Sequence, residues 1–225
     1  EEKRMKGRSR IAVLGLGDFG YHFACELYRL GHEVLAVDND QDKVQQILAK
    51  VTKAAVTDVG DRTALDELAV ASFDIVAVCL PERLETTVLL VHYLHQRQTP
   101  QILVKVANLD QAAIVKLVGA TEVILPDHST ARKTAMLIHH PRAIDYLELD
   151  GGHMVVAGRP PKTSIGKTVG ALALEQQYGV ALLGVWHSGQ EGAPDPPAGD
   201  RIIAEGDVLL LAGHLDRLRE LRKMK

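Results

Sequence analysis

The chain has 225 residues, of which 46% are hydrophobic and 24% charged, a composition typical of soluble globular proteins. The formal net charge is −3 and no basic block is present, so the sequence gives no indication of nucleic-acid binding. No apolar run approaches the roughly 18 residues of a membrane-spanning helix. Cys25 and Cys79 lie in a predicted helix and a predicted strand, which is typical of buried thiols in a reducing cytosol.

The first half of the chain alternates short apolar segments with helical patterns. The predicted strands are residues 11–14, 33–37, 54–56, 75–79, 102–106 and 123–125, and the predicted helices are 18–30, 40–50, 61–69, 82–97 and 109–118. Continuous apolar strands indicate a sheet that is buried on both faces by crossover helices. We therefore expect an α/β fold with a Rossmann-like doubly wound parallel sheet.

A glycine-rich turn follows the first predicted strand. Gly15 suits a tight turn, Gly17 lets the backbone approach a phosphate, and Gly20 lets the next helix pack on the sheet. The N-terminus of that helix offers unpaired N–H groups to an anion. Asp38 ends the second strand, where a carboxylate accepts hydrogen bonds from an adenosine ribose and disfavours the 2′-phosphate of NADP. Together these features predict an adenine-nucleotide site.

Asp18 stands between the second and third glycines and has two readings. It stabilises the helix dipole as an acid of the first turn, or it repels phosphates and so selects a dinucleotide over the more highly charged ATP. The two readings are compatible, and both stay open.

Other candidate contacts follow the predicted strands. Asp58 comes after the third strand and is expected on the adenine side, and Leu80 with Pro81 would cover the nucleotide from the other side. Lys105 lies in an apolar strand and needs a partner, either a phosphate or a carboxylate at the sheet edge. The remaining candidates adjoin these motifs: Phe19, Asn39 and Val59.

The sequence changes character after the sixth strand. A helix is predicted over residues 127–140 and a short helix over 142–147, before Asp150-Gly151-Gly152. Beyond it we expect strands at 153–158, 180–186 and 207–213, a helix capped by Ser164 and ended by Gly179, a Gly/Pro loop at 189–200, and a last helix over 214–225. This is a small, mainly antiparallel α+β module, whose modest core favours dimerisation or packing on a neighbour.

Enzyme motifs are missing from the sequence. No tyrosine has a lysine four residues later, and Pro161 stands where a P-loop ending at Gly166-Lys167-Thr168 needs its first glycine. The ten histidines lack the companions of a zinc site. We therefore expect the nucleotide to be an effector and the protein not to be an enzyme; a small NAD-dependent oxidoreductase is the alternative from another class.

Several of these motifs together resemble one known family. In order, GLGDFG, AVDND, TDVGDRTAL, FDIVAVCL, ILVKVAN and LVGATEVILPD resemble the RCK (KTN, or TrkA-N) domain, which gives a domain over residues 9–149. The segments TSIGKTVGALALEQQYGVALLGVWHSGQ and RIIAEGDVLLLAG resemble the TrkA C-terminal (RCK_C) domain, which gives a second domain over 150–225.

The resemblance implies a cytoplasmic regulatory subunit at the inner face of the cell membrane, of the kind that gates a potassium transporter. Its partners would be a membrane-embedded potassium-translocating subunit and further copies of itself, as dimers in an octameric ring with hinge helices within residues 127–147. The alternative is the cytosolic RCK portion of a larger potassium channel subunit, which an N-terminus without Met leaves open.

The resemblance also implies ligands. NAD, NADH, ADP or ATP would bind at Gly15, Gly17, Gly20, Asp38, Asp58 and Lys105. Asp127 matches an acid that binds a divalent cation, and some RCK_C domains bind cyclic di-AMP. ATP-responsive members often carry Arg where this chain has Asp18, so NAD or NADH is favoured over ATP.

Overall fold

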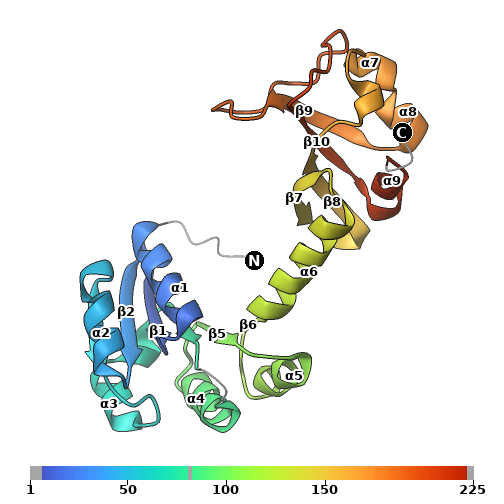
Figure 1. Cartoon of the computed structure of the whole chain (residues 1–225). Coiled ribbons are helices and arrows are strands. Elements are labelled where there is room, and N and C mark those ends of the chain that lie inside the picture. Colours follow the sequence, from blue (N-terminus) through green and yellow to red (C-terminus); the bar gives the residue numbers. More distant parts are fainter. Residues whose placement is uncertain (1–6, 81–82, 222–225) are drawn as a thin grey trace. The chain divides into compact units, whose positions relative to one another are not determined.

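A computed structural model describes residues 7–80 and 83–221 (Figure 1). Contacts divide the chain into two compact units, with the boundary after Thr130. The division lies before the boundary at residues 149 and 150 that the change in composition predicts. No helix within the described ranges is long and apolar enough to cross a bilayer.

The first unit contains a six-stranded parallel sheet with the strand order β3-β2-β1-β4-β5-β6. The strands are β1 (Arg10–Leu14), β2 (Glu33–Asp38), β3 (Lys53–Val56), β4 (Ile75–Val78), β5 (Gln101–Lys105) and β6 (Glu122–Ile124). The helices between them are α1 (Asp18–Arg29), α2 (Gln41–Ile47), α3 (Arg62–Glu67), α4 (Leu84–Gln96) and α5 (Leu109–Leu117). The predicted Rossmann-like sheet is confirmed, with shifted element ends; residue 82, where α4 was expected to begin, lies outside the described residues.

Both faces of this sheet are covered, which explains its continuous apolar strands. In β1, Ile11 and Val13 face a core cluster with side chains of α1 and α2, whereas Ala12 and Leu14 face a second cluster with side chains of α3, α4 and α5. Successive side chains of a strand point to opposite faces. Every position of such a strand must therefore be apolar.

The second unit begins within α6 (Pro126–His139), and the prediction for the segment after this helix is wrong. Residues 142–147 form no helix: β7 (Ala143–Glu148) pairs antiparallel with β8 (His153–Gly158), with Tyr146 opposite Val156. Gly151 and Gly152 connect the two strands at φ +69° and +76°, a region that favours glycine. Pairing with the neighbouring strand of the hairpin thus overrides a weak local helical pattern.

The other elements of this unit complete a four-stranded sheet. They are α7 (Val169–Leu172), α8 (Leu174–Tyr178), β9 (Ala181–His187), β10 (Asp207–His214) and α9 (Leu215–Glu220). The strands are antiparallel in the order β7-β8-β10-β9, which confirms the predicted module. The predicted continuation of the last helix over 222–225 lies outside the described residues.

The predicted cap of the middle helix is also wrong. Ser164 is buried in a 3₁₀ turn, and its hydroxyl donates to the Pro161 carbonyl at 2.6 Å. Thr168 caps α7 instead, because its side chain accepts from the Ala171 N–H at 3.3 Å. The helix breaks at Ala173, whose φ is +44°, and Gly179 ends α8 as predicted.

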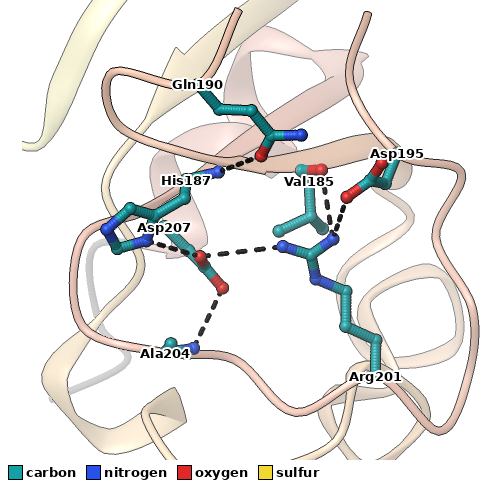
Figure 2. A network of polar contacts seen from close by, with 7 residues as sticks. All are labelled: Val185, His187, Gln190, Asp195, Arg201, Ala204 and Asp207. Atoms are coloured by element: carbon teal, nitrogen blue, oxygen red, sulfur yellow. Dashed lines mark hydrogen bonds and ion pairs between the residues drawn. The ribbon is translucent and has the colours of Figure 1, made fainter.

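A buried carboxylate holds the Gly/Pro loop between β9 and β10 (Figure 2). Asp207 is 2% exposed; its side chain accepts from the Ala204 N–H at 2.9 Å and lies 3.4 Å from His187 Nδ1 and 3.7 Å from Arg201 Nη2. Arg201 also donates to Asp195 Oδ2 at 2.6 Å. These contacts tie both ends of the loop to the edge of the sheet.

Candidate functional site

The carboxyl ends of β1 and β4 form the switch point of the first sheet. Chain order runs outward from this pair in both directions, toward β3 on one side and toward β6 on the other. Open α/β sheets bind ligands in the crevice at such a point. A cleft of about 150 Å³ opens there, and its lining residues are Gly15, Asp38, Asn39, Lys43, Asp58, Val59, Leu80 and Arg83.

The three glycines of the turn have different roles. Gly15 has φ +98°, and a Cβ there would lie 2.8 Å from the Cys79 carbonyl oxygen. A Cβ on Gly20 would lie 2.0 Å from the Gly15 carbonyl oxygen. A Cβ on Gly17 would meet no atom within 4 Å. Gly15 and Gly20 are therefore needed to close the turn, whereas Gly17 keeps the space in front of the α1 N-terminus open.

Asp38 is buried at 7% exposure and braces the same turn. Its Oδ2 accepts from the Leu16 N–H at 2.6 Å, and its Oδ1 accepts from the Asp40 N–H at 2.9 Å. A carboxylate offers about four lone-pair sites, so two remain for a ligand hydroxyl pair. Lys43 Nζ lies 3.9 Å from Oδ2, which places a cation beside this acid.

The loop after β3, the strand next to β2, supplies two further residues of the cleft, Asp58 and Val59. Asp58 Oδ1 accepts from the Gly60 N–H at 2.9 Å, which leaves its other carboxylate oxygen outside that turn. Asp61 caps α3 through the Thr63 and Ala64 N–H groups, as expected for an acid at this position. Val59 is 7% exposed and belongs mainly to the core.

Several predicted contacts do not line the cleft. Asp18 is exposed as the first residue of α1, next to the open space at Gly17. Phe19 stacks on Phe23 with 5.4 Å between ring centroids and packs against the core.

Lys105, half-buried at the end of β5, has no carboxylate oxygen of the described residues within 4.0 Å. Gly17 and Gly20 also lie outside the lining, and Pro81 lies outside the described residues.

Two cleft residues were not identified from the sequence. Lys43 lies in α2, in the helix that follows the acid of β2, and Arg83 precedes α4. The sequence signal for Lys43 is its position: it stands in the first turn of the helix that follows Asp38, five residues after that acid. Arg83 falls within the helix predicted over residues 82–97, and only the fold places it at the cleft, just before α4.

The predicted cation ligand stands apart. Asp127 is exposed in the first turn of α6. Within residues 7–80 and 83–221, no group of three or more His, Cys, Asp or Glu side chains is arranged to hold a metal ion. Asp127 as a metal ligand therefore stays a prediction.

The TrkA-N domain family matches residues 11–126, and the TrkA-C domain family matches residues 156–225. The Ktr system potassium uptake protein A of Bacillus subtilis (strain 168) is 29% identical over 94% of this chain and 94% of its own length. Protein C of the same system and organism is 28% identical over 96% and 97%.

Solved structures share the fold. The GsuK RCK domain superposes with a TM-score of 0.65 at 20% identity, covering 98% of this chain and 48% of that chain. A GsuK channel bound to NAD superposes with a TM-score of 0.62 at 20% identity, covering 98% and 40%. This chain thus spans about half, or less, of those solved chains. With one family matching just over half of its residues and the second matching most of the rest, the chain belongs to the TrkA-N family and carries a TrkA-C domain.

Proposed function

We propose that the chain is a regulatory subunit of a potassium-uptake system and binds an adenine nucleotide in its first unit as an effector. The observation that carries this proposal is the open turn at Gly17 beside the buried Asp38, in a chain similar to Ktr system potassium uptake proteins over nearly its whole length. Its partners would be a membrane-embedded potassium-translocating subunit and further copies of the chain, arranged in an octameric ring at the inner face of the cell membrane.

The nucleotide would extend from the cleft to the start of α1. Its ribose hydroxyls would use the two remaining lone-pair sites of Asp38, and its adenine would lie between Asp58 and Leu80. Its phosphates would meet the N–H groups at Gly17 and the positive end of the helix dipole. Lys105 would reach the phosphates from the neighbouring strand.

Asp18 favours NAD or NADH over ATP in this arrangement. The carboxylate is the first residue of α1 and is exposed at the phosphate end of the proposed site. Repulsion between two unit charges about 4 Å apart costs about 1–4 kcal/mol, depending on the effective dielectric constant. The penalty is larger for the triphosphate of ATP than for the diphosphate bridge of a dinucleotide, and ADP lies between them.

A nucleotide can regulate potassium uptake only if it binds two conformations of the protein with different affinities. Such coupling is typically about 1–3 kcal/mol, a 5- to 150-fold change in affinity. Helix α6 joins the nucleotide-binding unit to the second unit and is the natural element to carry the change. Binding of a divalent cation at Asp127 and of cyclic di-AMP in the second unit would be further inputs.

Calorimetric titration of the nucleotide-free chain with NAD, NADH, ADP and ATP tests the proposal. We expect the dinucleotides to bind tighter than ATP, and Asp18→Arg to raise the affinity for ATP about tenfold. Asp110→Arg is the matched control, because Asp110 is an exposed acid in the first turn of α5, two strands away from β1 in the sheet. Its affinities should stay as in the wild type.

The outcomes separate the parts of the proposal. If ATP binds tenfold tighter than NAD to the wild type, the preference for dinucleotides is wrong. If no adenine nucleotide binds, the effector site is wrong. Rubidium uptake by host cells with and without the chain tests the regulatory role, and steady nicotinamide turnover with small carbonyls or alcohols would instead indicate an oxidoreductase.

A further inference from the structure

The second unit contains a cavity that lies outside the proposed nucleotide site. It measures about 390 Å³, more than twice the volume of the nucleotide cleft, and lies between the sheet and helices α6 to α9. Met154 and Leu209 form part of its floor, and Leu172 and Leu174 form part of its wall; all four are at most 8% exposed. Pockets for small molecules typically measure about 300–1,000 Å³ and are lined by apolar side chains.

The charged side chains that line this cavity have a single sign. Arg142, Arg159 and Arg219 line it, and no aspartate or glutamate of the described residues does, although the whole chain has a net charge of −3. Arg159 is exposed and has no carboxylate oxygen within 4.0 Å among the residues that the structure describes. The ion pair of Arg219 within the described part of the chain is an exposed one with Asp216 at 3.4 Å, which contributes little to stability.

An apolar interior with cations around it is complementary to an amphipathic anion. A nucleotide fits less well, because most of the lining side chains are aliphatic and offer no hydrogen-bond partners to the edges of a base. A flat membrane surface fits poorly as well, because the apolar groups line a concave space. A single alkyl chain fills such a space, and an arginine forms short, charge-assisted hydrogen bonds with its carboxylate.

We propose that the second unit binds one fatty-acid-type carboxylate, with its alkyl chain in the cavity and its head group on Arg159, next to Arg142 and Arg219. The site would give the chain a second ligand, independent of the nucleotide in the first unit. Different groups would recognise the two parts of the ligand: the arginines select the anionic head group, and the leucines and Met154 select the alkyl chain.

The experiment measures binding of monomeric dodecanoate to the full-length chain by calorimetry, with dodecanol and dodecyltrimethylammonium as the uncharged and cationic analogues. We expect one dodecanoate per chain, and affinities at least tenfold lower for both analogues. Arg159→Ala should weaken dodecanoate about tenfold and leave dodecanol unchanged, because it removes one charge-assisted contact and little apolar surface.

Arg217→Ala is the matched control for that variant. Arg217 lies on α9 near Arg219 but does not line the cavity, and it pairs with Glu220 at 3.8 Å. The variant removes the same charge from the same unit, so it should bind dodecanoate as the wild type does. Equal losses in the two variants would show a diffuse charge effect and overturn the proposal.

A second variant tests the cavity itself. Ala143→Leu adds apolar volume at a lining position and should weaken dodecanoate and dodecanol together. Its circular dichroism and its nucleotide affinity show whether it is folded; if it is not, the comparison of the arginine variants decides. Binding of the cationic analogue as tightly as dodecanoate overturns the proposal, as does binding only to vesicles of anionic phospholipid.

Discussion

The two units stabilise their sheets in different ways. In the first unit, strands such as β1, β2 and β4 are buried along almost their whole length, with a core cluster on each face. In the second unit, β7 and β9 are largely exposed or half-buried, and the core cluster has five buried residues. The parallel sheet thus depends on dense packing on both sides, whereas the antiparallel sheet has one small core.

This difference determines where each unit is vulnerable. Tight packing leaves no room for added atoms, so the first unit should be most sensitive to small-to-large changes at its turn. The second unit has a cavity and a buried polar network, so it should be most sensitive to loss of a hydrogen-bonding partner (Figure 2). Three predictions test the contrast, in order of expected effect.

The largest effect is expected for Gly20→Ala in the first unit. Its Cβ would lie 2.0 Å from the Gly15 carbonyl oxygen, a backbone atom that cannot move without opening the turn. The clash should cost about 3 kcal/mol or more, which exceeds the gain of about 1 kcal/mol from replacing glycine by alanine in a helix. Nucleotide binding should be lost, while the fluorescence transition of Trp186 in β9 should be unchanged.

Gly17→Ala is the control for that variant. A Cβ at this position meets no neighbour within 4 Å, so the only expected cost is that of alanine in place of glycine at the N-cap of α1, about 1 kcal/mol or less. Its affinity for nucleotides should fall nonetheless, because the added methyl group stands where the phosphates would lie. Equal destabilisation by the two variants would contradict the assigned roles of the glycines.

The second effect is expected for Asp207→Ala in the second unit. The change leaves the Ala204 N–H without its acceptor and removes one partner of Arg201, which keeps the Val185 carbonyl and Asp195, at a cost of about 2–3 kcal/mol. Urea unfolding followed by Trp186, the only tryptophan of the chain, measures it directly. Asp195→Ala removes a half-exposed partner of the same arginine and should cost less than about 1 kcal/mol. Neither change should alter nucleotide affinity.

The third effect is a pH dependence confined to the first unit. Burial raises the pKa of the Cys79 thiol from 9.0 to about 12, and the nearby charge of Lys105 opposes this only in part. The unfolded chain therefore loses this proton first as the pH rises, so stability that is fully present below pH 9 is lost between about pH 9 and pH 12.

By pH 10.5 the loss should reach about 2 kcal/mol. Cys79→Ala should lack this component, so the stability of the wild type should fall more steeply than that of the variant between pH 8 and pH 10.5. Parallel curves for the two proteins would show that the thiol is not held protonated by burial.

Much of the first unit was predictable because its signals are local. Each strand is a short apolar run, each helix has its own period, and Gly15, Gly20 and Asp38 occupy fixed places in one strand–turn–helix–strand segment. The cleft was predictable in part: Asp38, Asn39 and Asp58 follow strand ends, whereas Lys43 and Arg83 reach it only through the packing of helices α2 and α4.

The sequence by itself therefore determined the parallel sheet, the glycine turn and the antiparallel character of the second unit, because these follow from periodicity and from the backbone freedom of glycine. Tertiary structure alone decided that residues 143–148 form a strand, that Thr168 replaces Ser164 as a cap, and that three arginines surround an apolar cavity. Each of these depends on contacts outside the segment itself. The strand needs its partner β8, the turn before α7 needs the Ile203 carbonyl that accepts from the Gly166 N–H, and the cavity needs four helices around one sheet.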